Sequence, residues 1–270
     1  MSGTTGSPNV CSCAETKPVG APAQGPDTCA IILAGGTGER FGDPRGKQFV
    51  DLCGLPLMCW SVMAFDHAPS VERLVIVCAP DKVAAVERDV LGPLTLSKPV
   101  SFAPAGPTRQ DSVYSGLQAV PRDQRIVAVH DSARPLIDIE AIERACATVR
   151  ADETLAGAIC ACRSIDTLKL VEGEQVVATP DRSFYWCAQT PQVFWAKPLR
   201  AAYRAALWDG YLGTDDSSLV ERHGGRVLCV ETSRDNIKVT IPEDLAVAQA
   251  TLEQRLVEEG CGRKPGRDVQ

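Results

Sequence analysis

Apolar runs of strand length recur along the chain and alternate with stretches of helical periodicity. The runs lie at residues 29–33, 74–79, 100–103, 126–130, 156–162 and 227–230. Short continuous apolar runs are typical of strands buried on both faces, and helices between successive strands are typical of parallel sheets. The pattern therefore predicts an α/β fold with a mostly parallel, twisted sheet and helices on both of its faces.

Two of the predicted helices carry clear start signals. An apolar stripe of Ile139, Ile142, Cys146 and Val149 follows Asp138, which we predict to be the N-cap. A second stripe consists of Leu245, Ala248, Leu252 and Leu256, and we predict that Thr240 and Glu243 form a capping box before it. Each stripe is expected to face the sheet.

Residues 164–181 break this alternation. The segment TLKLVEGEQVVAT predicts two short strands joined at Glu172, Gly173 and Glu174. It holds too few apolar side chains for a core of its own, and an isolated hairpin is only marginally stable in water. We therefore expect a protruding β-arm that packs on another surface, with a partner subunit as the simplest candidate.

Length and composition favour one domain. The chain has 270 residues, of which 44% are apolar, so it can bury a full core. We predict a single domain over residues 29–258, a disordered N-terminal extension over residues 1–28 and a flexible tail over residues 259–270. The extension has no hydrophobic segment of a secretory signal, and no run of about 18 apolar residues predicts a membrane span.

Charge and cysteine content narrow the function classes. A net charge of −6 argues against a nucleic-acid surface and favours small anionic substrates. The twelve cysteines include no C-x-x-C pair. We expect the cysteines within apolar runs to be reduced core residues, which implies a reducing compartment; these are Cys29, Cys78, Cys160, Cys162 and Cys229.

The first apolar run leads into a glycine-rich turn. Residues 29–48 read CAIILAGGTGERFGDPRGKQ and end with the cations Arg40 and Lys47. Backbone N–H groups in such a turn can converge on a phosphate, and cations just beyond it can neutralise the charge of a phosphoryl group in transfer. We interpret this segment as a triphosphate site.

Two familiar phosphate loops do not fit this segment. The dinucleotide fingerprint needs a third glycine where Phe41 stands. A Walker loop also fails at Phe41, and it fails again at Gln48, which replaces the Ser or Thr that binds Mg²⁺. The remaining alternative is that the glycines only turn the chain, and the nearby Arg40 and Lys47 count against it.

Polar motifs follow three of the predicted strands. They are GGTGERFGDPRGK, AGPTRQDS and HDSARP. Ligands of open α/β sheets bind beyond the carboxyl ends of the strands, so the three loops are expected to share one site. Two structural alternatives stay open: Asp131 and Arg134 could form an ion pair, and Arg109, Asp111 and Ser112 could be only a helix start.

Six sequence blocks together resemble 2-C-methyl-D-erythritol 4-phosphate cytidylyltransferases of the non-mevalonate isoprenoid pathway. The blocks are AGGTGERF, GKQ, RQDSVYSGLQ, HDSARPL, QTPQVF and NIKVTIPEDL, between residues 29 and 252. The resemblance implies a Rossmann-like nucleotidyltransferase that transfers CMP from CTP to methylerythritol phosphate and releases pyrophosphate. It implies catalytic roles for Arg40 and Lys47.

The resemblance also assigns the binding residues. It implies contacts with CTP from Ala34, Gly35, Gly36, Thr37, Gly38, Gly106, Ser112 and Asp131. For the acceptor it points to Thr167, Arg182, Thr190 and Lys238. Mg²⁺ is the expected cofactor, held mainly by CTP phosphate oxygens, with Asp131 and Asp235 as candidate ligands. Similar enzymes are homodimers in which the β-arm reaches the neighbouring active site.

The sequence departs from the family at three places and leaves alternative functions open, and one departure is Pro107, where some relatives carry an acidic residue near the base. Gly46 stands where the family usually has proline before the lysine, and Pro180 replaces an apolar residue before Asp181 and Arg182. A ribitol 5-phosphate cytidylyltransferase and a non-catalytic CTP-binding regulator are the rival functions. RQDSVYSGLQ and HDSARPL look more like plant, algal or chlamydial relatives, so the expected compartment is a plastid stroma or a bacterial cytoplasm.

Overall fold

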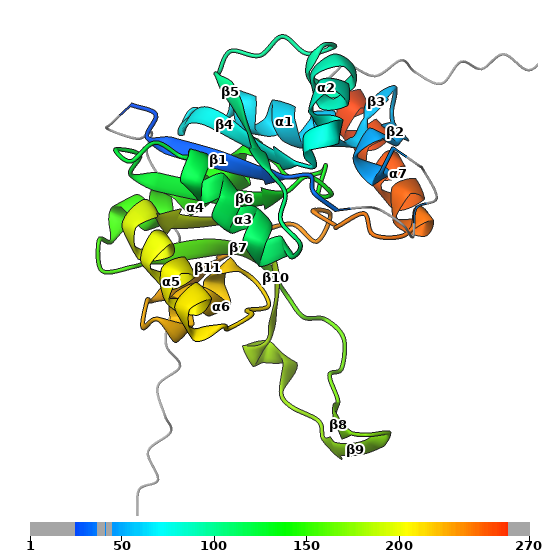
Figure 1. Ribbon diagram of the computed structural model, residues 1–270. Coiled ribbons are helices and arrows are strands. Elements are labelled where there is room, and N and C mark those ends of the chain that lie inside the picture. The colour runs from blue at the N-terminus through cyan, green and yellow to red at the C-terminus, as the bar shows by residue number, and fades with distance from the viewer. Residues whose placement is uncertain (1–24, 37–40, 42–44, 259–270) are drawn as a thin grey trace, which may run out of the picture.

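A seven-stranded sheet forms the centre of the protein (Figure 1). The computed structural model describes residues 25–36, 41 and 45–258. The strand order is β11-β7-β10-β6-β1-β4-β5, and every pairing is parallel except those of β10 with β6 and β7. The bounds are β1 Thr28–Leu33, β4 Val71–Cys78, β5 Val100–Pro104, β6 Ile126–Asp131, β7 Gly157–Arg163, β10 Trp186–Trp195 and β11 Val227–Glu231.

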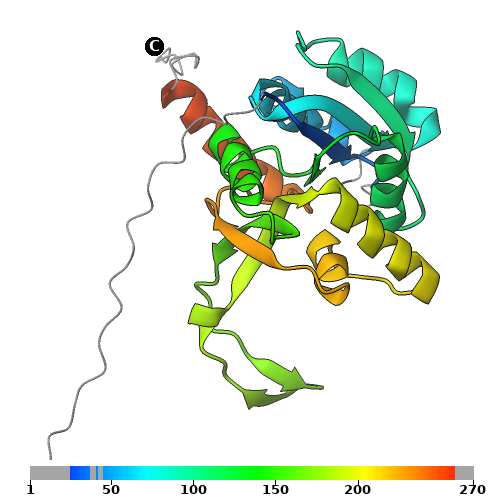
Figure 2. The same cartoon turned by 90° about the vertical axis from the view of Figure 1, so that its left-hand side faces the viewer.

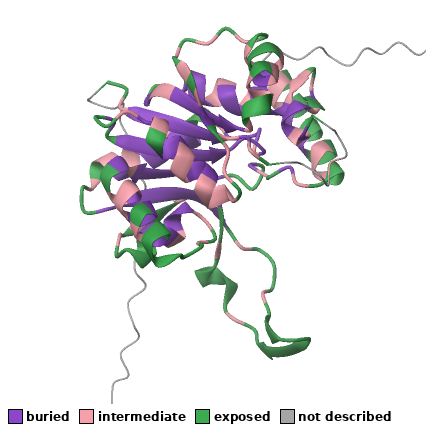
Figure 3. Ribbon diagram, viewed as in Figure 1, coloured by how far each residue is buried: buried purple, intermediate pink, exposed green. Residues whose placement is uncertain are grey.

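Helices cover both faces of this sheet (Figures 1 and 3). One face carries α1 (Leu57–His67), the short α2 (Val83–Ala85) with the π-helical turn η4 (Val86–Leu91), and α4 (Ile139–Ala151). The other face carries α3 (Arg109–Ala119), α5 (Ala196–Asp209) and α6 (Asp216–Arg222). The predicted α/β architecture is confirmed.

The alternation of side chains along the strands divides the core in two. Ile31 of β1 pairs with Val75 and Val129, and all three lie in the cluster under α3 and α5. The next residue, Ile32, lies with Ile76 in the cluster under α1 and α4. Strands buried on both faces need apolar residues at every position, which is why these runs are continuous in the sequence.

A smaller unit lies beside the sheet. The hairpin of β2 (Asp51–Leu52) and β3 (Leu55–Pro56) packs against α7 (Pro242–Glu258), and Leu52, Ala248 and Leu252 belong to their shared apolar cluster. The stripe of this helix therefore faces the two-stranded sheet of β2 and β3 and not the seven-stranded sheet. The short hairpin, which has only two residues in each strand, provides the apolar surface instead.

The start of α7 also differs from the predicted capping box. The Asp244 carboxylate accepts hydrogen bonds from the backbone N–H groups of Thr240 (2.7 Å) and Ile241 (3.0 Å), while the Thr240 hydroxyl donates to the Lys238 carbonyl. The acidic capping partner is thus one residue later than predicted. The other predicted cap is confirmed, because the Asp138 side chain accepts from the Ala141 N–H at 2.6 Å.

The predicted hairpin is present as an arm that projects from the body (Figures 1 and 2). Its strands are β8 (Leu170–Glu172) and β9 (Gln175–Ala178), and Gly173 turns the chain between them with φ of 57°. Every residue of β8 and β9 is exposed (Figure 3), including Val171 and Val176. A short 3-10 turn, η5 (Arg182–Phe184), leads back to β10.

The strand β10 was not predicted, although it lies inside the sheet. Its buried residues include Gln189, Thr190 and Gln192, and Pro191 follows a cis peptide bond. The buried amides are satisfied by partners far along the chain: Gln192 donates to Asp215 at 2.7 Å and accepts from the Ser217 N–H at 3.0 Å. Polar residues with such distant partners do not produce an apolar strand pattern.

The cysteines largely follow the prediction. Cys29, Cys78, Cys160 and Cys162 are buried free thiols, whereas Cys229 is exposed. That one expectation was wrong because β11 is an edge strand, with neighbours on one side only. Within the described residues, no helix is long and apolar enough to cross a membrane.

Candidate active site

The sheet changes direction of winding between β1 and β6. The chain proceeds from β1 outward to β4 and β5, and then returns to place β6 on the other side of β1. Loops at such a switch point part to opposite sides and leave a crevice at the carboxyl ends of the strands. Ala34, Gly35 and Gly36 follow β1 there, and Asp131 ends β6.

The glycine turn lies against the loop that follows β5. A Cβ added to Gly35 would come within 2.6 Å of the Ala105 Cβ, so only glycine permits this approach. The Gly106 N–H donates to the Ser112 hydroxyl at 3.0 Å. The structure therefore brings these predicted nucleotide-binding residues together, while Thr37, Gly38 and Arg40 lie outside the described residues.

Ser112 and its neighbours also start α3. Thr108 is the N-cap, and its hydroxyl and the Asp111 carboxylate form a capping box. The Ser112 hydroxyl donates to the Thr108 carbonyl at 2.9 Å. This segment therefore does start a helix, but Arg109 and Ser112 also contact Asp131 and Gly106, so they are not only a helix start. The segment holds the loop around Gly106 in place and directs Arg109 toward β6.

Asp131 is held between two cations. Its carboxylate accepts from Arg109 Nε at 3.1 Å and from Lys238 Nζ at 2.7 Å. Burial alone would raise the pKa of Asp131, but the positive charges of Arg109 and Lys238 hold it well below its usual range. The alternative ion pair with Arg134 was wrong, because Arg134 donates to the backbone carbonyls of Asn236 (2.7 Å) and Ala188 (3.5 Å) instead.

A buried acid fixes the other side of Arg109. Asp216 is fully buried and accepts from Arg109 Nη2 at 2.9 Å, and it also accepts from the Tyr203 hydroxyl. Burial raises the pKa of Tyr203, and the Asp216 charge raises it further. Neither Asp216 nor Tyr203 was predicted from the sequence as a residue of this site. Only the TDDSS segment, a polar helix start, could have drawn attention to Asp216.

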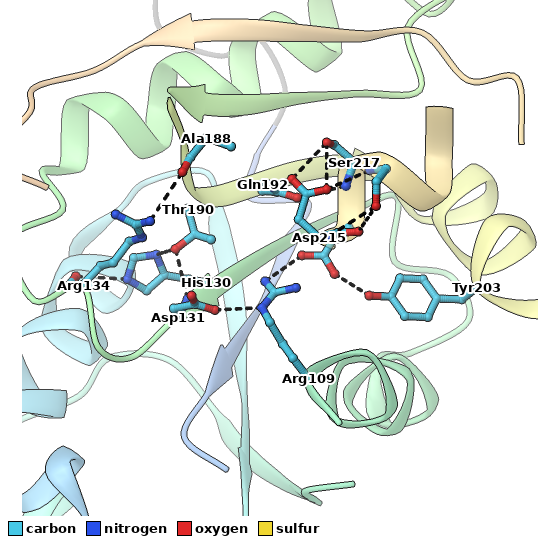
Figure 4. A network of polar contacts seen from close by, with 12 residues as sticks. Arg109, His130, Asp131, Arg134, Ala188, Thr190, Gln192, Tyr203, Asp215 and Ser217 are labelled. Atoms are coloured by element: carbon cyan, nitrogen blue, oxygen red, sulfur yellow. Dashed lines mark hydrogen bonds and ion pairs between the residues drawn. The ribbon is translucent and has the colours of Figure 1, made fainter. Parts of the chain in front are cut away.

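Thr190 holds Asp131 from the direction of β10. Its hydroxyl accepts from the Asp131 N–H at 3.1 Å and donates to His130 Nδ1 at 3.1 Å, while His130 Nε2 donates to the Arg134 carbonyl at 3.2 Å. Because burial lowers the pKa of His130, the ring is neutral, and with its proton on Nε2 the other nitrogen, Nδ1, is an acceptor. The predicted substrate residue Thr190 is 4% exposed, and its hydroxyl is engaged inside the protein. It thus positions the Asp131 backbone (Figure 4).

His130 makes stability depend on pH. Burial lowers its pKa from 6.5 to about 3. Between these two pH values the side chain is protonated in the unfolded chain but stays neutral in the folded chain. The stabilisation is complete above pH 6.5 and is lost as the pH falls toward 3. We expect the free energy of unfolding to fall by about 1.4 kcal/mol for each pH unit below 6.5. Urea denaturation between pH 7 and 5 measures this slope.

Two variants test the assignment of that slope. The free energy of unfolding of His130→Gln should be nearly constant between pH 7 and 5. His67→Gln, which changes an exposed side chain, should keep the wild-type slope. An NMR titration that shows His130 protonating above pH 5 in the folded protein would contradict the interpretation.

Lys47 and Lys238 approach the site from different parts of the chain. Lys47 Nζ donates to the Val239 carbonyl at 3.1 Å, which brings Lys47 beside the loop that carries Lys238. The preceding Gly46 has φ of 103°, a conformation that proline cannot adopt. Gly46 therefore gives the Lys47 loop a backbone path that the proline usual in the family would not allow.

The two remaining acceptor residues lie on the arm. Thr167 and Arg182 are exposed, and the Arg182 guanidinium donates to the Ile165 carbonyl of the same arm. In the described contacts neither residue reaches Asp131 or Lys238. Within one chain the structure does not bring these predicted residues to the strand ends.

Asp131 is the one described carboxylate at the strand ends that is placed to bind a metal ion. Among the described residues no three His, Cys, Asp or Glu side chains cluster as metal ligands. Asp131 is ionised at the strand end, whereas Asp235 is 57% exposed and lies 3.8 Å from Arg255. Mg²⁺ is commonly bound by one or two carboxylates together with substrate phosphates. The donor set fits a metal ion that arrives with a triphosphate.

The fold and the strand-end site together are those of a nucleotidyltransferase. The chain belongs to the 2-C-methyl-D-erythritol 4-phosphate cytidylyltransferase family, whose model matches residues 28–254.

Curated relatives and solved structures agree with this assignment. The chain is 42% identical to the 2-C-methyl-D-erythritol 4-phosphate cytidylyltransferase of Geobacillus thermodenitrificans, over 85% of this chain and 98% of the relative. It is 38% identical to that of Caldanaerobacter subterraneus, over 83% and 97%. The crystal structure of 4-diphosphocytidyl-2C-methyl-D-erythritol synthase from Anaerococcus prevotii matches with a TM-score of 0.75 and 26% identity, over 84% of this chain and 96% of that one.

Proposed function

We propose that the protein transfers CMP from CTP to 2-C-methyl-D-erythritol 4-phosphate, giving 4-diphosphocytidyl-2-C-methyl-D-erythritol and pyrophosphate. The observation that carries the proposal is the meeting of the glycine turn, the Gly106 loop and the Arg109–Asp131–Lys238 group at one switch point. The family match over residues 28–254 supports it. This reaction is one step in the synthesis of isoprenoid precursors.

The chemistry needs positioned cations more than a strong base. An oxygen of the acceptor phosphate attacks the α-phosphorus of CTP, and the bond to the bridging oxygen breaks so that pyrophosphate leaves. Negative charge grows on the α-phosphoryl group, and Arg40 and Lys47 are assigned to stabilise it. His130 is buried, neutral and bonded on both ring nitrogens, so it takes no part as a base.

Mg²⁺ belongs to this proposal as the cofactor. When bound, it would screen the charge of the triphosphate, with Asp131 as its protein ligand. Asp131 is prepared for that role because Arg109 and Lys238 keep it ionised.

A homodimer completes the acceptor site in this proposal. The β-arm exposes apolar side chains that include Val171, Val176 and Phe184, with Phe184 83% exposed. A second copy of the chain could cover them, and the arm would then bring Thr167 and Arg182 to the partner's Lys238. CTP and methylerythritol phosphate would bind between the strand ends of one chain and the arm of the other.

A two-acceptor assay tests the function. Pyrophosphate release from CTP with Mg²⁺ is measured with methylerythritol phosphate and, separately, with ribitol 5-phosphate. We expect faster turnover with methylerythritol phosphate. Faster turnover of ribitol phosphate would identify the rival cytidylyltransferase, and CTP binding without turnover of either acceptor would identify a regulator.

Arg182→Ala should chiefly raise KM for the acceptor phosphate. Arginine can hold a phosphate with two parallel hydrogen bonds, so its loss weakens acceptor binding in the ground state. Initial rates at varied acceptor and saturating CTP give the two constants. Arg88→Ala, which removes an exposed arginine that pairs with Asp89, is the control. An effect confined to KM for CTP would contradict the assignment.

A further inference from the structure

Two cysteines face each other where the arm leaves the body. Cys162 of β7 lies directly opposite Cys187 of β10 in the antiparallel register. Side chains opposed in this way share one face of the sheet, with Cβ atoms about 4.5–5.5 Å apart. A disulfide needs Cα atoms about 4.4–6.8 Å apart, which adjacent antiparallel strands provide. The backbone therefore already places the two thiols within bonding range after small side-chain rotations.

The two thiols differ in their access to solvent. Cys187 is exposed, whereas Cys162 is 7% exposed. Burial raises the pKa of the Cys162 thiol, and the neighbouring Cys187 raises it further. An oxidant from solvent therefore meets Cys187 first and leaves Cys162 as the resolving partner.

We propose that Cys162 and Cys187 are a dithiol pair that closes reversibly to a disulfide at the root of the β-arm. The oxidant is a low-molecular-weight disulfide such as oxidised glutathione. The Cys187 thiolate attacks one of its sulfurs, and one thiol leaves. The Cys162 thiolate then attacks the Cys187 sulfur of the mixed disulfide and releases the second thiol. Two protein thiols and one small disulfide thus become one protein disulfide and two small thiols.

The position of the pair gives the bond a structural effect. The arm departs after Arg163 and returns at Trp186, the residues next to the two cysteines. Only noncovalent contacts join the root there now: the Ser164 N–H donates to the Tyr185 carbonyl at 3.0 Å, and the Arg163 guanidinium lies 4.4 Å from the Trp186 ring centroid. A disulfide would join the two strands covalently and hold the root of the arm closed.

The buried cysteine also contacts the interior behind the active site. Gln189 Nε2 donates to Cys162 Sγ at 3.5 Å, and Gln189 Oε1 accepts from the Thr232 hydroxyl (2.9 Å) and from Asn236 Nδ2 (3.0 Å). Thr232 and Asn236 belong to the loop that continues to Lys238. The proposed disulfide is therefore one side chain away from the segment that carries an acceptor-site lysine.

Peptide mapping of the oxidised full-length chain tests the proposal. The protein is incubated with oxidised glutathione, remaining thiols are alkylated, and the tryptic digest is analysed by mass spectrometry without reduction. We expect one linked pair of peptides, residues 151–163 and 183–200, that separates after dithiothreitol treatment. Hydrogen exchange around the arm root should also slow in the oxidised chain.

Matched variants assign the linked atoms. Cys187→Ser and Cys162→Ser should each abolish the linked pair, while Cys160→Ser, within the same peptide as Cys162, should keep it. Cys229→Ser removes another exposed thiol, opposite Ile159 and not another cysteine, and should also keep it. Glutathione found on Cys187 without any linked peptide would overturn the proposal. A disulfide between the Cys187 residues of two chains, or unchanged hydrogen exchange at the root, would also overturn it.

Discussion

Replacing Lys47 with alanine is expected to lower kcat for CMP transfer by about a hundredfold while the fold stays intact. The lysine lies beside the loop of Val239 and Lys238. In the proposed mechanism its ammonium group contacts the α-phosphoryl group of CTP. Such a contact strengthens as negative charge develops, so its loss affects turnover more than binding. Steady-state rates at saturating CTP and acceptor, together with a thermal melt, measure both properties.

A lysine elsewhere on the surface controls for the loss of charge. Lys197 is exposed on α5, and Lys197→Ala should keep wild-type rates. Arg40 is assigned the same role from the sequence, so Arg40→Ala should also lower kcat, by more than about tenfold. A Lys47→Ala protein with wild-type kcat would remove this lysine from the mechanism.

Asp216→Ala is expected to lower the free energy of unfolding by about 3–5 kcal/mol. The substitution leaves Arg109 without its buried counter-charge and the Tyr203 hydroxyl without its acceptor. Asp131 then remains as the carboxylate bonded to Arg109, so the position of Arg109 is also less defined. Urea denaturation followed by tryptophan fluorescence gives the free energy.

An ion pair of the same type on the surface provides the comparison. Asp209 accepts from Arg222 at 2.9 Å, the same distance as between Asp216 and Arg109. The side chains of Asp209 and Arg222, however, are both about half exposed. Asp209→Ala should cost less than about 1 kcal/mol. Equal losses for the two variants would show that burial of Asp216 does not set its contribution.

The parallel strands were predictable because their environment is uniform. The central strands β1, β4 and β6 are covered on both faces, so a continuous apolar run such as that of β1 identifies each of them without knowledge of its neighbours. The arm was predictable for the opposite reason, since its turn residues and sparse apolar side chains describe a hairpin without a core. In both cases the deciding information lies within about ten residues of chain.

The missing parts depend on residues far apart in the sequence. Gln189, Thr190 and Gln192 fill β10 with polar groups whose partners lie on other elements, so local pattern predicted no strand there. Arg109 and Asp216 are separated by 107 positions, and neither position alone indicates a buried ion pair. The strand-end motifs predicted that the loops of Gly35, Gly106 and Asp131 lie at one edge of the sheet, but they did not predict the network that holds Asp131.

The arm interrupts two strands that are already neighbours in the sheet. β7 and β10 run antiparallel and pair up to Arg163 and Trp186, so a tight turn of two residues could connect them without changing the rest of the topology. The intervening segment is thus an insertion into an otherwise ordinary hairpin. Its length and sequence are free to diverge without a penalty in folding, and selection can act on them only through whatever the arm touches outside its own chain.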